Sequence, residues 1–111
     1  MLIVKDNGSI ELTRGDTARL TVDLTDDEDQ EYIMRSTDTL TMTVKTSVKD
    51  SEPCFQKTST GNNMIHIKPE DTAELDYGKY VYDVELHTED GDVYTVIEKS
   101  EFKLRDEVTT K

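Results

Sequence analysis

Residues 69–104 of the chain read PEDTAELDYGKYVYDVELHTEDGDVYTVIEKSEFKL, and this stretch decides the fold. From Tyr80 to Leu86 every second residue is aromatic or aliphatic, and the positions between them hold Val, Asp and Glu. Successive side chains of a strand point to opposite faces of a sheet, so this alternation predicts a strand with one buried and one mostly wet face. Asp90-Gly91 then favours a tight turn, because glycine accepts a positive φ, and a second β-rich run covers Val93–Ile97. The stretch therefore predicts a β-hairpin.

The same alternation recurs along the rest of the chain. Outside the hairpin we expect strands over Leu2–Lys5, Ser9–Leu12, Thr17–Thr25, Thr39–Thr46 and Met64–Lys68, a short one over Tyr32–Met34, an edge strand that begins at Pro53-Cys54-Phe55, and a last strand that contains Phe102 and Leu104.

No long segment has helical spacing, and only Pro69–Thr72 suits the first turn of a short helix or a corner, because proline and acids are tolerated at a helix start. Short strands separated by polar turns are typical of sandwiches. We therefore predict an all-β, immunoglobulin-like antiparallel β-sandwich of seven to nine short strands. One domain covers residues 1–107, and residues 108–111 form a C-terminal tail.

Three polar segments are expected to connect the strands. Asp26–Glu31 is acidic at every position but Gln30, which excludes a buried strand and predicts a loop. Thr58–Asn63 is the most loop-like segment of the chain. Arg14-Gly15-Asp16 spells a cell-adhesion motif, but we interpret it as a tight turn between strands with Gly15 as the turn residue, because three common turn-compatible residues coincide easily.

The composition narrows the classes of partner. The net charge is −12 over 111 residues, and a surface this negative disfavours binding to nucleic acid and to anionic membranes, which need clustered Lys and Arg. No apolar run approaches the length of a membrane span, and MLIVK at the N-terminus is too short for the apolar region of a signal peptide, so neither is expected. The single cysteine, Cys54, excludes an intrachain disulfide and fits a cytosolic origin or a bacterial or viral assembly that does not use disulfides.

The residues that could support catalysis are few. His66 and His87 belong to no spaced metal motif, and His66 falls on the outward phase of its predicted strand. Cys54 needs a neighbouring histidine to act as a nucleophile, and a partly buried structural thiol is the simpler interpretation. We therefore expect no enzyme activity, no catalytic residues and no cofactor.

Ligand binding is the stronger alternative. Clustered carboxylates suit calcium, although neither acidic turn matches an EF-hand loop, and the weak candidate ligands are Asp26, Asp27, Asp29, Asp90 and Asp92. A carbohydrate platform would use the tyrosines at positions 77, 80, 82 and 94, although Tyr80 and Tyr82 have the spacing of core residues.

Two resemblances add to this interpretation. Pro69–Ala73 resembles the turn before strand F of immunoglobulin variable domains, where the pattern continues as Asp-x-Ala-x-Tyr-x-Cys. Here Leu75 takes the place of the corner tyrosine and Tyr77 that of the disulfide cysteine. This likeness implies a similar corner in a sandwich and nothing about antigen binding.

The second resemblance spans most of the chain. Ile10–Thr17, Leu40–Lys45, Pro69–Thr72, Tyr77-Gly78-x-Tyr80 and the Asp-Gly hairpin together resemble small β-sandwich proteins of phages and prophages of Gram-positive bacteria. They are similar to the N-terminal domain of baseplate upper proteins and to related tail or head-fibre components. A full baseplate protein continues into further domains, so a free-standing small protein and a fragment are equal alternatives here. The resemblance supplies no functional residues.

The resemblance implies a non-enzymatic structural or protein–protein interaction module of a phage or prophage particle. Its partners are then other virion structural proteins, with a homo-oligomer as one option, and its location is the virion or, before assembly, the bacterial cytoplasm. The alternative is a carbohydrate- or calcium-binding β-sandwich module.

Overall fold

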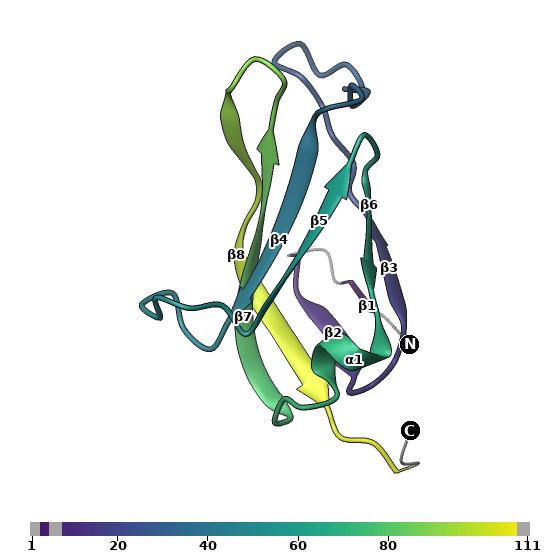
Figure 1. Cartoon of the computed structure of the whole chain (residues 1–111), viewed down its shortest axis with the longest axis vertical. Helices are drawn as coiled ribbons and strands as arrows, with labels where there is room; N and C mark the ends of the chain where they lie inside the picture. Colours follow the sequence, from purple (N-terminus) through teal and green to yellow (C-terminus); the bar gives the residue numbers. More distant parts are fainter. Residues whose placement is uncertain (1–2, 5–7, 109–111) are drawn as a thin grey trace.

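The computed structural model describes residues 3–4 and 8–108, which form two β-sheets packed against each other (Figure 1). The larger sheet has the strand order β1-β2-β8-β7-β4-β5, and the smaller sheet pairs β3 with β6. In chain order the elements are β1 (Ile3–Val4), β2 (Ile10–Thr13), β3 (Ala18–Thr21), β4 (Thr39–Lys45), β5 (Phe55–Thr60), β6 (Met64–Ile67), α1 (Pro69–Thr72), β7 (Gly78–His87) and β8 (Val93–Arg105). The predicted all-β sandwich is confirmed, and the described residues contain eight strands.

One strand pair departs from the antiparallel expectation. β2 runs parallel to β8, from Ile10 opposite Phe102 to Thr13 opposite Arg105, whereas the other strand pairs are antiparallel. Parallel neighbours need a long connection, and here the chain between β2 and β8 provides it.

The core lies between the two sheets and is built from the inward faces of alternating strands. The central strands β4 and β7 set its register, with Leu40 opposite Leu86 and Met42 opposite Val84. The Phe102 ring meets the Tyr82 ring edge-on, with centroids 6.3 Å apart. The buried apolar residues are Ile10, Leu12, Ala18, Leu20, Val22, Leu24, Leu40, Met42, Val44, Ile65, Ile67, Tyr80, Tyr82, Val84, Leu86, Phe102 and Leu104.

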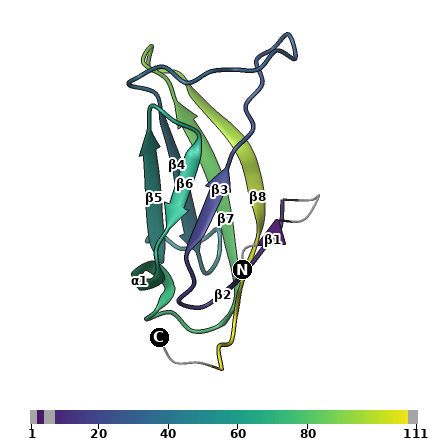
Figure 2. The same ribbon diagram turned by 90° about the vertical axis from the view of Figure 1, so that its right-hand side faces the viewer.

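The predicted helical turn is present as α1 and closes one end of the sandwich (Figure 2). The Asp71 carboxylate accepts a hydrogen bond from the Lys68 backbone amide at 2.7 Å, which caps the start of the helix. Thr72 is fully buried, and its Oγ1 accepts a hydrogen bond from the Gly15 amide at 2.8 Å. Gly15 has φ +82° and lies in the tight turn that was predicted for the Arg-Gly-Asp tripeptide.

A tyrosine corner follows α1, but at a different position from the one that the sequence suggested. The Tyr80 hydroxyl donates to the Asp76 carbonyl at 2.5 Å, and Tyr82 is buried two residues later. In immunoglobulin domains a tyrosine at this corner bonds back to the backbone a few residues upstream, and a disulfide cysteine follows two residues later. The placement of this corner at Leu75 and Tyr77 is therefore wrong, and Tyr82 fills the core where a disulfide would lie.

Several predicted strand limits are wrong. β8 is one strand from Val93 to Arg105 where two were expected. β5 continues through Thr60, so the loop predicted at Thr58–Asn63 begins later; threonine fits a pleated surface, and the Thr58 and Thr41 hydroxyls lie 3.3 Å apart across the pair. β5 is an edge strand, as predicted, but begins at Phe55.

The segment around the acidic loop also differs from expectation. β3 ends at Thr21, although Val22 and Leu24 keep the alternation and are buried. Tyr32–Met34 forms no strand. The Tyr32 amide donates a hydrogen bond to the Leu24 carbonyl at 2.9 Å, but the pairing does not continue into a ladder. The predicted loop at Asp26–Glu31 is confirmed apart from an isolated bridge between Thr25 and Glu31.

Two predicted segments lie partly outside the described residues. Within Leu2–Lys5 only Ile3–Val4 is described, as β1, and within the predicted tail only Val108 is described. In the described part of the chain, no helix is long and apolar enough to span a membrane.

Candidate functional site

The β7–β8 hairpin extends past the smaller sheet and leaves part of its inner face uncovered (Figures 1 and 2). β7 has 10 residues and β8 has 13, whereas β3 and β6 have 4 each. The chain that follows β3 covers only one side of the hairpin end. A hollow therefore remains at this end of the sandwich.

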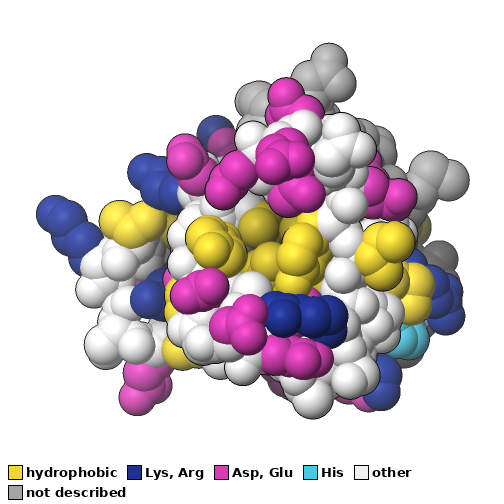
Figure 3. Space-filling model, turned by 90° about the horizontal axis from the view of Figure 1, so that it is seen from above, with side chains coloured by type: hydrophobic (Ala, Val, Ile, Leu, Met, Phe, Trp, Pro, Cys, Tyr) yellow, Lys and Arg dark blue, Asp and Glu magenta, His cyan; other side chains and the backbone are white. Residues whose placement is uncertain are grey.

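This hollow is a pocket of about 350 Å³, which we call the hairpin-end pocket. Viewed onto this end, hydrophobic side chains lie in the centre, acidic side chains lie above and below them, and a basic side chain lies at the lower edge (Figure 3). Leu24 and Leu86 are buried, Tyr32 and Val96 are half-buried, and Tyr94 is 53% exposed. The lining residues are Asp23, Leu24, Thr25, Asp26, Asp27, Tyr32, Leu86, Thr88, Tyr94, Thr95 and Val96.

Irregular pairing in β8 shifts Tyr94 along the hairpin to the position opposite Leu86. Tyr82 pairs with Ser100 and Glu85 pairs with Thr95. Between these two pairs β7 advances by three residues and β8 by five, so β8 has two extra residues. Extra residues of this kind bend a strand and increase its twist. Beyond them Tyr94 pairs with Leu86, whose side chain is on the inner face. The bulges thus place Tyr94 at the pocket.

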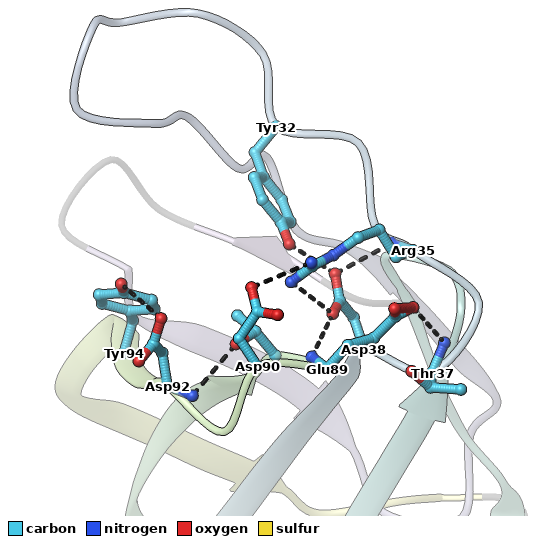
Figure 4. A network of polar contacts seen from close by, with 9 residues as sticks. Tyr32, Arg35, Thr37, Asp38, Glu89, Asp90, Asp92 and Tyr94 are labelled. Atoms are coloured by element: carbon cyan, nitrogen blue, oxygen red, sulfur yellow. Dashed lines mark hydrogen bonds and ion pairs between the residues drawn. The ribbon is translucent and has the colours of Figure 1, made fainter.

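The Tyr32 wall of the pocket is fixed by a buried carboxylate (Figure 4). Asp38 has no exposed surface and accepts hydrogen bonds from the Tyr32 hydroxyl at 2.5 Å and from the Arg35 and Glu89 amides, each at 2.9 Å. Burial alone would raise the pKa of Asp38, but these donors and the Arg35 charge outweigh it and lower that pKa to about 2. The bond to Asp38, together with burial, raises the pKa of Tyr32.

Arg35 extends this network to the hairpin turn. Its guanidinium lies 3.4 Å from Asp38 and 3.1 Å from Asp90, and the bond to Asp90 is the main cause that raises the pKa of Arg35. The Thr37 amide also approaches Glu89, at 3.5 Å. Residues 32–38 are thus joined to the β7–β8 turn by several contacts, and the pocket has a defined shape without a ligand.

The calcium candidates are divided between two turns and are mostly used within them. Asp26 Oδ1 accepts the Glu28 and Gln30 amides at 2.9 and 3.0 Å. Asp90 is paired with Arg35, and Asp92 lies 3.5 Å from the Tyr94 hydroxyl. The exposed side chains of Asp27 and Asp29 belong to the same loop as Asp26. Within residues 3–4 and 8–108, no group of three or more His, Cys, Asp or Glu side chains is placed to hold a metal ion.

The possible catalytic side chains lie on separate elements. His66 is on β6 opposite Arg19, and His87 ends β7 with its Nε2 3.1 Å from Glu85. Cys54 precedes β5, and its amide bonds to the Val44 carbonyl near the end of β4. His87 pairs with Thr39, at the other end of β4. Thr39 and Val44 are five residues apart, which is about 17 Å along a strand, so Cys54 and His87 lie far from each other.

The tyrosines form no single platform. Tyr80 and Tyr82 are core residues, as predicted. Tyr77 is exposed near α1, with the Arg14 guanidinium 5.5 Å from its ring centroid. Tyr94 lies at the opposite end, in the hairpin-end pocket.

A second hollow of about 320 Å³ lies on the outer face of the larger sheet. Its wall contains Asp83, whose pKa is raised by burial and by the nearby Glu85, while Lys45 opposes that rise. The lining carries both signs of charge, which favours no ligand class. It consists of Thr43, Lys45, Val48, Ser51, Pro53, Gln56, Val81, Tyr82, Asp83, Glu85 and Lys99.

Comparison with protein-family models finds no matching family, and comparison with curated proteins finds no match either. The functional argument therefore depends on the geometry of this chain.

Proposed function

We propose that this protein is a non-enzymatic protein–protein interaction module that contacts its partner through the hairpin-end pocket. The observation that supports this proposal is an apolar hollow on an open end of the sandwich. Leu24 and Leu86 form its floor, and the side chain of Tyr94 remains 53% exposed beside it. Exposed apolar clusters with a polar rim typically mark interaction sites.

The composition of the pocket favours a protein partner. Tyrosine is enriched among the residues that contribute most to protein interfaces, because it provides a large contact area at low conformational cost. Tyr32 and Tyr94 stand on two different segments of the pocket, and the exposed Val93 adjoins Tyr94. At about 350 Å³ the pocket is near the lower limit for small-molecule sites, which suits one or two side chains of a partner.

We further propose that the module acts in a phage or prophage particle, as a baseplate, tail or head-fibre component. The resemblance of its strand and turn pattern to small phage β-sandwich proteins supports this setting. The partner is then another virion subunit or a second copy of this chain, and the protein resides in the virion or, before assembly, in the bacterial cytoplasm.

Site-specific cross-linking tests the proposal. A photoreactive phenylalanine analogue replaces Tyr94 in the pocket, and the control carries it at Glu74, an exposed position near α1. Both variants are expressed in the source cells during particle assembly, and the particles are purified and irradiated. We expect a cross-link from position 94 to a virion protein and none from position 74. Particles that lack the chain, or equal cross-linking from both positions, would refute the proposal.

A further inference from the structure

We propose that the hairpin-end pocket selects a partner segment in which one large apolar side chain is flanked by lysine or arginine. This inference rests on the proposed function and adds the chemistry of the partner. It depends on two independent features of the pocket, its apolar floor and the sign of the charges around it.

The charged side chains that line the pocket are all acidic. Asp23, Asp26 and Asp27 line the pocket, and the described lining residues include no lysine or arginine. Asp90 and Asp92 stand on the facing hairpin turn. Figure 3 shows acidic side chains above and below the apolar centre, and a basic side chain at its lower edge.

The one nearby arginine does not balance these acids at the pocket. Arg35 lies within 3.4 Å of Asp38 and 3.1 Å of Asp90, so its charge is shared between two carboxylates. Asp23 and Asp27 are exposed residues. A cationic group of a partner would therefore meet a negative rim, and such complementarity determines specificity and accelerates association.

The apolar floor determines what lies between the partner's cations. Leu24, Leu86 and Val96 offer no charged group, and the Tyr32 hydroxyl is already bonded to Asp38. An apolar side chain loses no hydrogen bond when it reaches this floor, whereas a polar one would exchange its hydrogen bonds with water for contacts with aliphatic groups there. The negative rim also disfavours phosphate backbones and anionic lipid.

Synthetic peptides test this inference directly. The probe is a nine-residue peptide, blocked at both ends, with a central phenylalanine flanked on each side by two lysines and then by glycine and serine. One comparison peptide replaces the phenylalanine with serine, and the other replaces the four lysines with glutamates. Binding is measured by amide NMR shifts of the ¹⁵N-labelled protein, at low salt and at 0.5 M salt.

We expect the probe peptide to shift the amides of Thr88, Tyr94 and Val96, and both comparison peptides to bind at least tenfold more weakly. High salt should weaken the probe peptide, since exposed charges are screened. The double variant Asp23→Asn with Asp27→Asn should lose about threefold to tenfold in affinity, the effect of two exposed charge pairs. Asp50→Asn with Glu52→Gln, on the exposed connection between β4 and β5, is the matched control and should bind as the wild type does.

Equal binding of the lysine and glutamate peptides would overturn the charge selection, and equal binding of the phenylalanine and serine peptides would overturn the apolar anchor. If the photoreactive analogue at position 94 still cross-links to a virion protein in either case, the proposed function stands and this inference alone fails. If cross-linking fails while the probe peptide binds at the pocket, the proposed setting fails and the partner chemistry stands.

Discussion

The buried hydrogen bond between Thr72 and Gly15 gives a sharp prediction about stability. Replacing Thr72 by valine keeps the shape and β-branching of the side chain. It removes Oγ1, which accepts a hydrogen bond from the Gly15 amide at 2.8 Å. Leaving a buried donor without a partner costs about 1–3 kcal/mol. An unfolding entropy of about 2.1 cal/mol/K per residue gives about 0.23 kcal/mol/K for 111 residues, so a loss of about 2 kcal/mol lowers Tm by about 9 °C.

The assay is thermal and urea unfolding followed by circular dichroism, with Thr72→Ser as the matched control. Serine keeps the hydroxyl and loses one buried methyl group, worth about 0.8 kcal/mol. We therefore expect wild type to be the most stable, then the serine variant, then the valine variant, with peptide binding at the hairpin-end pocket unchanged in all three. A valine variant at least as stable as the serine variant would show that the hydrogen bond contributes no more than one buried methyl group, and would refute the reasoning.

Three further predictions concern the hairpin end, the N-terminal segment and calcium. The pKa of Asp38 is about 2 in the folded chain and 3.8 in an unfolded one, so the stabilisation from its charge should be complete above pH 4 and lost as the pH falls through 2. The difference in Tm between wild type and Asp38→Asn should therefore become smaller over that range. A difference that stays constant from pH 7 to 2 would contradict this. Gly8 and Gly91 both have a positive φ, +86° and +89°, but a Cβ at Gly8 would lie 2.9 Å from Ser100 Oγ, whereas a Cβ at Gly91 would have no atom within 4 Å. In urea unfolding, Gly91→Ala should lower the free energy of unfolding by about 1–2 kcal/mol, and Gly8→Ala should lower it by more. The reverse order would argue against the Ser100 contact. Millimolar calcium should leave Tm unchanged, because Asp26 already accepts two backbone amides and Asp90 is paired with Arg35. A rise of several degrees would favour the calcium-binding alternative.

The sequence predicted the fold where periodicity alone determines it. The alternation from Tyr80 to Leu86 predicted which side chains of β7 face the core. The alternating residues of β4, from Leu40 to Val44, lie directly opposite them. The helical turn at Pro69 was also readable, because proline and acids mark a helix start. These are local signals that need no knowledge of the partner strand.

Where pairing determines the structure, the sequence was insufficient. The bulges of β8 depend on its register against β7, and nothing in the run from Val93 to Lys99 shows that two residues are extra. The site was missed for the same reason. Asp38 reads as one more acid in a turn, and only the fold brings the Tyr32 hydroxyl and the Glu89 amide to it. The sequence analysis did single out three residues that line the pocket, Tyr94 for carbohydrate and Asp26 and Asp27 for calcium, but it did not bring them together.

The buried carboxylate explains why the hairpin-end pocket is available for binding. A carboxylate without exposed surface is stable only where donors surround it, and Asp38 obtains them from the loop that carries Tyr32 and from the turn that follows β7. Any collapse of the pocket that moved Tyr32 over Leu86 would break the hydrogen bond between Tyr32 and Asp38. The same bonds that stabilise this end therefore hold the pocket open, and a partner that enters it does not need to order these loops first. Such preorganisation strengthens binding, because less conformational entropy is lost when the complex forms.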